Sequence, residues 1–179
     1  MKKVLLHICC GVCAIGSVKE LQEKGFEVVG FYFNPNIYPQ EEYNKRKEVV
    51  AEVEKITQIK VVYGEYDNVK WENYCIPQES YRDLSEGGVR CFLCYEYRLR
   101  ETYKKLLDLR CDFFTTTLTI SPYKKSKDIF EIGKKIDKEK FLGIDFKKKD
   151  GFKKTILLSK ELNFYHQNYC GCRYSMRRR

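Results

Sequence analysis

The sequence lacks the segments that mark membrane and secreted proteins. None of its 179 residues belong to an apolar run approaching the roughly 18 residues that a membrane-spanning helix needs. Only the short run Val4-Leu5-Leu6-His7-Ile8 separates the N-terminal lysines from the first cysteines, which is too little for the apolar core of a secretory signal. We therefore expect a cytoplasmic protein with no membrane partner.

The chain also lacks internal repeats, low-complexity segments and linkers rich in proline, glycine or serine. At this length, with 43% hydrophobic residues, it can bury one sizeable core and is too short for two generous domains. We expect a single domain over residues 1–179, with a basic C-terminal tail over about 163–179.

Acidic residues are too few to balance the basic ones. The 25 Asp and Glu residues face 34 Lys and Arg residues, which gives a net charge of +9. Such a surface favours a polyanionic partner, most often nucleic acid, although charge alone is equally compatible with plain solubility. Lysines crowd residues 147–154, and aromatic residues alternate with arginines after residue 163, a mixture that suits unpaired bases and phosphates.

The apolar pattern predicts an α/β fold. A strand around Val4-Leu5-Leu6, a helix over 14–24 and a strand over 26–33 form a strand-helix-strand unit with parallel strands. Further strands are expected over 59–63 and 112–118, with a short one over 141–146. Helices are expected over 39–56, 127–140 and 155–162, and one more has Cys91 and Cys94 on its first turn and runs to about Arg110. We interpret the fold as a Rossmann-like, three-layer domain with a mostly parallel sheet of about four to five strands.

The nine cysteines are grouped and not spread as in a disulfide framework. In a reducing compartment such grouping indicates metal or redox chemistry. Cys75 and Cys111 are read as buried core thiols. The other seven stand at spacings typical of ligands: Cys9, Cys10, Cys13, Cys91, Cys94, Cys170 and Cys172.

Two of these groups complete one set of four ligands. Cys9 and Cys10 follow the first strand, where open α/β sheets place their binding crevice. Cys91 and Cys94 open a helix whose dipole favours thiolate; alone, such a pair could also be half of a zinc site or a redox dithiol. Cys13 and the Cys170-Gly171-Cys172 segment remain for a second metal or a redox-active disulfide, and the sequence does not choose between them.

Five motifs, taken together, resemble the QueH-type epoxyqueuosine reductases, which finish the queuosine modification of tRNA. They cover residues 7–13, 86–94, 114–122, 145–151 and 165–172. The resemblance implies a [4Fe–4S] cluster held by Cys9, Cys10, Cys91 and Cys94, without cobalamin. It also implies that Cys170 and Cys172 form a nearby redox pair or bind a second mononuclear iron, with Cys13 as a further candidate catalytic thiol.

The implied substrate is tRNA carrying epoxyqueuosine at the anticodon wobble position, together with an external electron donor. Removing the epoxide oxygen as water needs two electrons and two protons, whereas one cluster passes one electron at a time. A second redox centre, which the remaining thiols could supply, or a second reduction is therefore required. A coordinated iron beside the cluster could also act as a Lewis acid for the epoxide oxygen. His7, Tyr165 and Tyr169 are candidate proton donors by their nearness in sequence to the thiols.

Three alternatives remain open. An iron–sulfur tRNA sulfurtransferase would bind ATP through a Ser-Gly-Gly-x-Asp-Ser type loop, but Cys9-Cys10-Gly11 occupies that place. A zinc-stabilised RNA-binding protein would hold zinc in place of iron. A thiol–disulfide oxidoreductase would stay active after metal removal.

Overall fold

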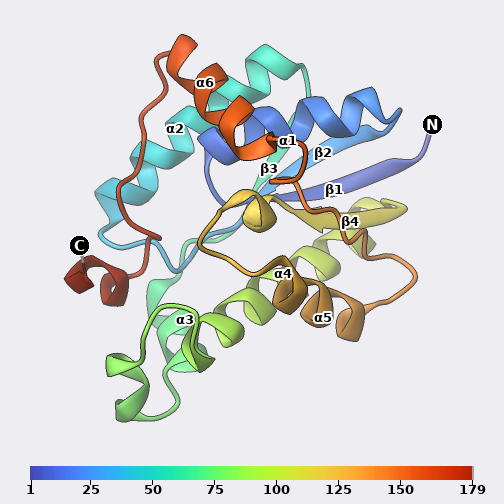
Figure 1. Ribbon diagram of the computed structural model, residues 1–179. Coiled ribbons are helices and arrows are strands. Elements are labelled where there is room, and N and C mark those ends of the chain that lie inside the picture. Colours follow the sequence, from blue (N-terminus) through green and yellow to red (C-terminus); the bar gives the residue numbers. More distant parts are fainter. Residues whose placement is uncertain (179) are drawn as a thin grey trace.

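A sheet of four parallel strands forms the centre of the computed structural model, which describes residues 1–178, with side chains as far as Met176 (Figure 1). The strand order is β3-β2-β1-β4. The strands are β1 (Lys3–Ile8), β2 (Glu27–Tyr32), β3 (Lys60–Tyr63) and β4 (Phe113–Thr116). The predicted parallel α/β class is confirmed. A strand over 141–146 does not form, since that segment contributes only an isolated bridge between Phe141 and Phe114.

Six α-helices and three 3₁₀ segments complete the described part of the chain. The helices are α1 (Gly11–Glu23), α2 (Gln40–Thr57), α3 (Asn68–Cys75), α4 (Val89–Leu109), α5 (Ser126–Ile136) and α6 (Gly151–Glu161), and the 3₁₀ segments are Glu79–Asp83, Thr117–Ile120 and Arg173–Arg178. Helix α5 is shorter than the predicted 127–140. Asp137 ends it because its carboxylate accepts hydrogen bonds from the backbone of Glu139 and Lys140, an Asx-type turn that competes with the helix.

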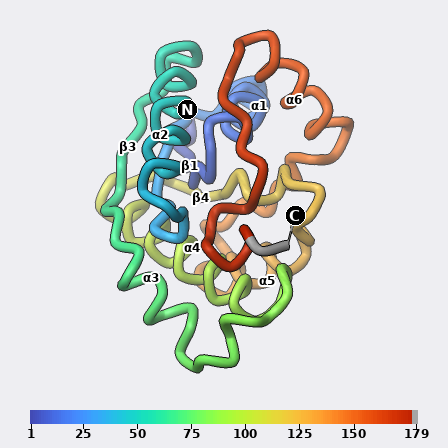
Figure 2. Tube along the Cα trace, turned by 90° about the vertical axis from the view of Figure 1, so that its left-hand side faces the viewer, coloured from blue at the N-terminus to red at the C-terminus, as the bar shows by residue number. Residues whose placement is uncertain are grey.

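The sheet lies between two layers of helices, as predicted. Helices α1, α2 and α6 cover one face, and α4 and α5 cover the other (Figures 1 and 2). Strand β1 packs against both layers of helices, because successive side chains of a strand point to opposite faces of the sheet. Leu6 and Ile8 are fully buried in the core under α1 and α2, while Leu5 is fully buried in the core under α4.

The strand order also fixes the position of the site. From the central strand β1 the chain pairs with β2 on one side and with β4 on the other. In open parallel sheets, ligands bind beyond the carboxyl ends of the strands at the point where the order reverses. Here that point lies where β1 is followed by Cys9 and β4 by Thr117.

The segment after α6 crosses this edge of the sheet and does not extend away from the domain (Figure 2). Phe164 and Tyr174 are buried, and Tyr174 lies under the guanidinium of Arg90. These rings are therefore occupied within the protein, and are not available to the unpaired bases that the sequence pattern suggests. The side chains of Arg177 and Arg178, and all of Arg179, lie outside the described residues.

Candidate metal centre

Three thiols gather at the carboxyl end of β1. The sulfurs of Cys9, Cys10 and Cys13 all lie within 4.8 Å of one another. Cys10 caps the N-terminus of α1, where its Sγ accepts a hydrogen bond from the backbone of Cys13 (3.3 Å). Thr117, beyond β4, donates its hydroxyl to Cys9 Sγ (3.1 Å) and accepts the Cys9 backbone N–H (3.0 Å). Both strands therefore fix Cys9.

The three thiols cannot all ionise on their own. Hydrogen bonds from Cys10 and Cys13 lower the pKa of Cys9 well below its usual value. Contacts of Cys13 with the thiols of Cys10 and then Cys9, followed by burial, raise the pKa of Cys13 well above the usual value of a thiol. One negative charge thus suppresses the next, as expected for coupled sites. A soft cation removes this penalty, so the donor set fits a thiolate-bound metal centre.

A second thiol group lies on the first turns of α4. Cys91 Sγ accepts the backbone N–H of Gly87 (3.3 Å), whose φ of +87° suits glycine, and burial raises the pKa of Cys91 to about 12. Cys94 behaves in the opposite way: its contact with the thiol of Cys75, followed by the charge of Arg98, lowers its pKa to about 6. Cys75, which the sequence analysis left as a core thiol, is buried but also belongs to the surroundings of Cys94.

Arg98 connects the two thiol groups. It is 2% exposed, and its Nη1 lies 4.0 Å from Cys94 Sγ, while Nη2 donates to Asn34 Oδ1 (2.5 Å). No carboxylate pairs with it among the residues that the structure describes, and the negative charges acting on it are those of thiols, Cys94 first and then Cys9. A buried cation without a counterion is costly, so anionic sulfur is its natural partner.

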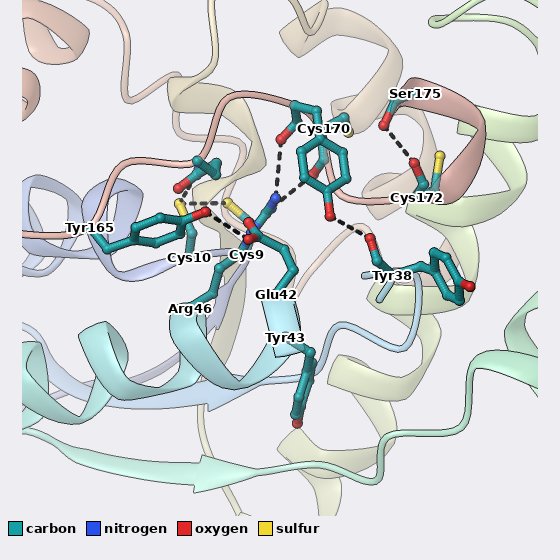
Figure 3. A network of polar contacts seen from close by, with 12 residues as sticks. Cys9, Cys10, Tyr38, Glu42, Tyr43, Arg46, Tyr165, Cys170, Cys172 and Ser175 are labelled. Carbon is teal, nitrogen blue, oxygen red and sulfur yellow. Dashed lines mark hydrogen bonds and ion pairs between the residues drawn. The ribbon is translucent and has the colours of Figure 1, made fainter. Parts of the chain in front are cut away.

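The C-terminal thiols reach the site because α2 holds their backbone (Figure 3). Arg46 donates from Nη1 to the carbonyl of Cys170 (3.0 Å) and from Nη2 to that of Tyr169 (3.2 Å). The backbone N–H of Tyr38 donates to the carbonyl of Gly171 (2.9 Å). Gly171 has a φ of +136°, and a Cβ there would lie 3.2 Å from Arg46 Nη1, so this turn favours glycine.

A cavity of about 260 Å³ opens beside the sulfurs. Cys9, Cys13 and Cys170 line it, together with Arg98 and Lys124. Of the other cysteines assigned from the sequence, Cys10 is buried beside Cys9, whereas Cys91, Cys94 and Cys172 lie in the core packed under α4. Burial raises the pKa of Cys172 to about 11. Cys170 and Cys172 are both free thiols.

The structure brings Cys9, Cys10 and Cys13 together most closely. Neither Cys91 nor Cys94 belongs to this group, and no second group of three metal-binding side chains of this kind is found within the described residues. The sequence analysis missed Arg98. The spacing in the sequence could have identified Arg98, because it lies four residues after Cys94 and hence on the same face of the helix.

The sequence also matches a known protein family. A model of the family described as "Epoxyqueuosine reductase QueH" matches residues 4–178. The chain belongs to this family. A QueH epoxyqueuosine reductase from Thermotoga maritima is 36% identical over 98% of this chain and 91% of its own length. One from Streptococcus pyogenes is 34% identical over 96% of this chain and 69% of its own length.

Solved structures share the fold at low sequence identity. One is a predicted subunit of a tRNA methyltransferase from Methanocaldococcus jannaschii, with a TM-score of 0.57, 13% identity, and coverage of 90% of this chain and 75% of that one. Another is the U34-tRNA thiolase NcsA from Methanococcus maripaludis with its [4Fe–4S] cluster, with a TM-score of 0.55, 14% identity, and coverage of 97% and 60%. At these identities the likeness concerns the α/β fold of this QueH family member.

Proposed function

We propose that this protein reduces epoxyqueuosine to queuosine within tRNA. The reaction takes two electrons and two protons, removes the epoxide oxygen as water and leaves a carbon–carbon double bond. The observation that carries the proposal is membership of the QueH family over residues 4–178, combined with thiols from two distant segments around one cavity, Cys9 and Cys13 from one and Cys170 from the other.

We assign a [4Fe–4S] cluster to this site, with Cys9, Cys10, Cys91 and Cys94 as its ligands. A cluster takes one thiolate on each of four irons, so its ligands can come from two separate pairs. The two thiols with lowered pKa values, Cys9 and Cys94, belong one to each pair, which supports this assignment. When bound, the cluster supplies electrons singly. Cys13, Cys170 and Cys172 remain for a second centre, either a mononuclear iron or a redox pair.

Lys124 is the candidate proton donor. It lines the cavity, and although burial, the largest single effect, lowers its pKa, the negative charges at Cys170, Tyr95, Cys9 and Glu86 together outweigh burial and raise the pKa. Its ammonium therefore carries a proton at neutral pH and can give it to the departing oxygen. His7 does not suit this role, because burial and then the charge of Arg98 lower its pKa to about 3 and keep it neutral.

The proposed partners are tRNA carrying epoxyqueuosine and an external electron donor. A net charge of +9 suits a polyanionic substrate, and its binding should weaken steeply as salt is added. We place this work in the cytoplasm, where tRNA is modified. Among the described residues, no helix combines the length and the apolar character that crossing a membrane requires.

The test is reduction of the modified tRNA by the purified protein. Protein reconstituted anaerobically with iron and sulfide is incubated with epoxyqueuosine-bearing tRNA and dithionite, and the nucleosides are analysed by mass spectrometry. We expect queuosine to appear with iron-loaded protein and not with metal-free protein. Unchanged epoxyqueuosine with an iron-loaded, folded protein would refute the proposal, as would activity that is retained with zinc alone.

A further inference from the structure

Two aromatic rings stand at the rim of the thiol cavity without a partner. Tyr123 is 77% exposed and Phe152 is 38% exposed, and both line the cavity. They come from different elements: Tyr123 from the turn before α5, and Phe152 from the first turn of α6. In the part of the chain that the structure describes, neither ring packs against another ring or a cation. Water is therefore their neighbour, which costs free energy for apolar surface.

Three other exposed aromatic residues are occupied within the protein, whereas Phe92, for which the described residues offer no ring or cation partner either, does not line the cavity. The ring of Tyr38 lies under the guanidinium of Arg173, with 4.3 Å between them. Tyr74 packs on Tyr97 at a centroid distance of 4.9 Å. Tyr165 donates its hydroxyl to Glu42 (2.7 Å). Tyr123 and Phe152 thus differ from these rings in having a face free for a partner from outside the chain.

The turn that presents Tyr123 is held in place. Lys147 Nζ donates to the carbonyls of Thr119 (2.9 Å) and Lys124 (3.1 Å) and to the hydroxyl of Ser126 (2.6 Å). These three bonds bracket Tyr123 on both sides. They also show that Lys147, which the sequence pattern grouped with phosphate-binding lysines, has an internal role. A ring on a fixed turn loses little freedom when it binds.

The cavity itself limits what can enter it. A cavity of about 260 Å³ excludes a base-paired stem, so an RNA substrate can reach the thiols only by turning its target nucleotide out of the loop. The bases on either side then lose a stacking neighbour. Aromatic rings at the mouth can replace it, and the exposed lysines beside them, Lys125 and Lys153, can meet the adjoining phosphates.

We propose that Tyr123 and Phe152 form a stacking platform for the unpaired bases that flank the target nucleotide of an RNA loop. This rests on the proposed action on tRNA and adds how the substrate is gripped. The two rings would bind the loop bases through their faces, whatever the base, while the cavity between them receives the nucleotide that reacts.

The test measures binding of an anticodon stem-loop RNA to the iron-loaded protein under anaerobic conditions. Stacking of one base on one ring contributes about 1 to 3 kcal/mol to binding. Tyr123→Ala and Phe152→Ala should therefore each raise the dissociation constant by about 5- to 150-fold. Tyr123→Phe keeps the ring and should bind as the original protein does. Leu157→Ala is the matched control: it lies on α6, is 53% exposed and does not line the cavity.

A second RNA identifies the contact. In a stem-loop with abasic sites on both sides of the target nucleotide, the original protein should bind as weakly as the double variant Tyr123→Ala/Phe152→Ala binds the normal loop, and that double variant should lose nothing further. Alanine variants that bind the normal loop as tightly as Leu157→Ala overturn the proposal, as does an equal loss with the abasic loop. Ring-dependent binding without reduction of epoxyqueuosine would leave the platform in place and refute the reductase proposal instead.

Discussion

Replacing Arg98 by glutamine tests whether a buried positive charge prepares Cys94 as a thiolate. The guanidinium Nη1 lies 4.0 Å from Cys94 Sγ, and both groups are buried. At 4 Å and an effective dielectric constant of about 20, two unit charges interact by about 4 kcal/mol. At 1.36 kcal/mol per pKa unit, this corresponds to about 3 units. We expect Arg98→Gln to raise the pKa of Cys94 by up to that amount, because the uncharged side chain no longer stabilises the thiolate.

The assay uses metal-free protein, so that no metal competes with protons for the thiols. Brief exposure to iodoacetamide at a series of pH values, followed by peptide mass spectrometry, gives the midpoint for alkylation of Cys94. In the original protein that midpoint should lie near 6, the value to which the neighbours of Cys94 lower its pKa. Arg98→Lys keeps the charge and should shift the midpoint less than Arg98→Gln does.

Arg100→Gln is the matched control, since Arg100 lies on the same helix, is exposed and pairs with Glu96 at 2.7 Å. It should leave the midpoint where it is. The iron-loaded protein offers a second measurement: loss of the positive charge should make the reduction potential of the metal centre more negative. An unchanged midpoint in Arg98→Gln, with the protein folded, would show that the charge does not act on Cys94.

Three further predictions concern other parts of the site. His7 takes up a proton near pH 6.5 in the unfolded protein and only near pH 3 in the folded protein. The free energy of unfolding of metal-free protein should therefore fall by up to about 5 kcal/mol as the pH drops through this window. Denaturant titrations at a series of pH values should show that His7→Gln flattens this dependence. Lys124→Met should slow single-turnover reduction about 10²- to 10⁴-fold with unchanged tRNA affinity, whereas equal losses of rate and affinity would point to a binding role. Gly171→Ala should cost about 1 to 3 kcal/mol in chemical denaturation, because φ there is +136°; a wild-type midpoint would contradict the need for glycine.

The sequence was sufficient for the parts of the fold that depend on local pattern. Continuous apolar runs predicted the strands, and the strand-helix-strand spacing predicted their parallel pairing. The predicted strand over 141–146 was wrong, because the residues of this segment are apolar for another reason. Phe141 packs on Phe114 and Phe130 as a core side chain, and the segment forms only one isolated bridge to β4.

Features that depend on distant contacts could not be predicted in this way. The sequence around Arg98 and Arg100 does not distinguish the two residues. Arg98 contacts Asn34 and His7, which belong to the first strand-helix-strand unit, whereas Arg100 is exposed and pairs with Glu96. Cys75 contacts Cys94 only through the packing of α3 on α4. The residues after 163 fold back because Arg46, far away in sequence, binds their carbonyls.

The hydrogen bond from Arg46 to the Cys170 carbonyl also has a consequence for when the site can form during synthesis of the protein. Residues 9 to 13 leave the ribosome early, whereas residue 170 emerges only after every strand of the sheet has been synthesised. A nascent chain that met iron at that early stage would offer it an incomplete set of sulfurs. We therefore expect metal delivery to wait for the finished fold, and the carrier that delivers it to meet a closed scaffold and not a growing one.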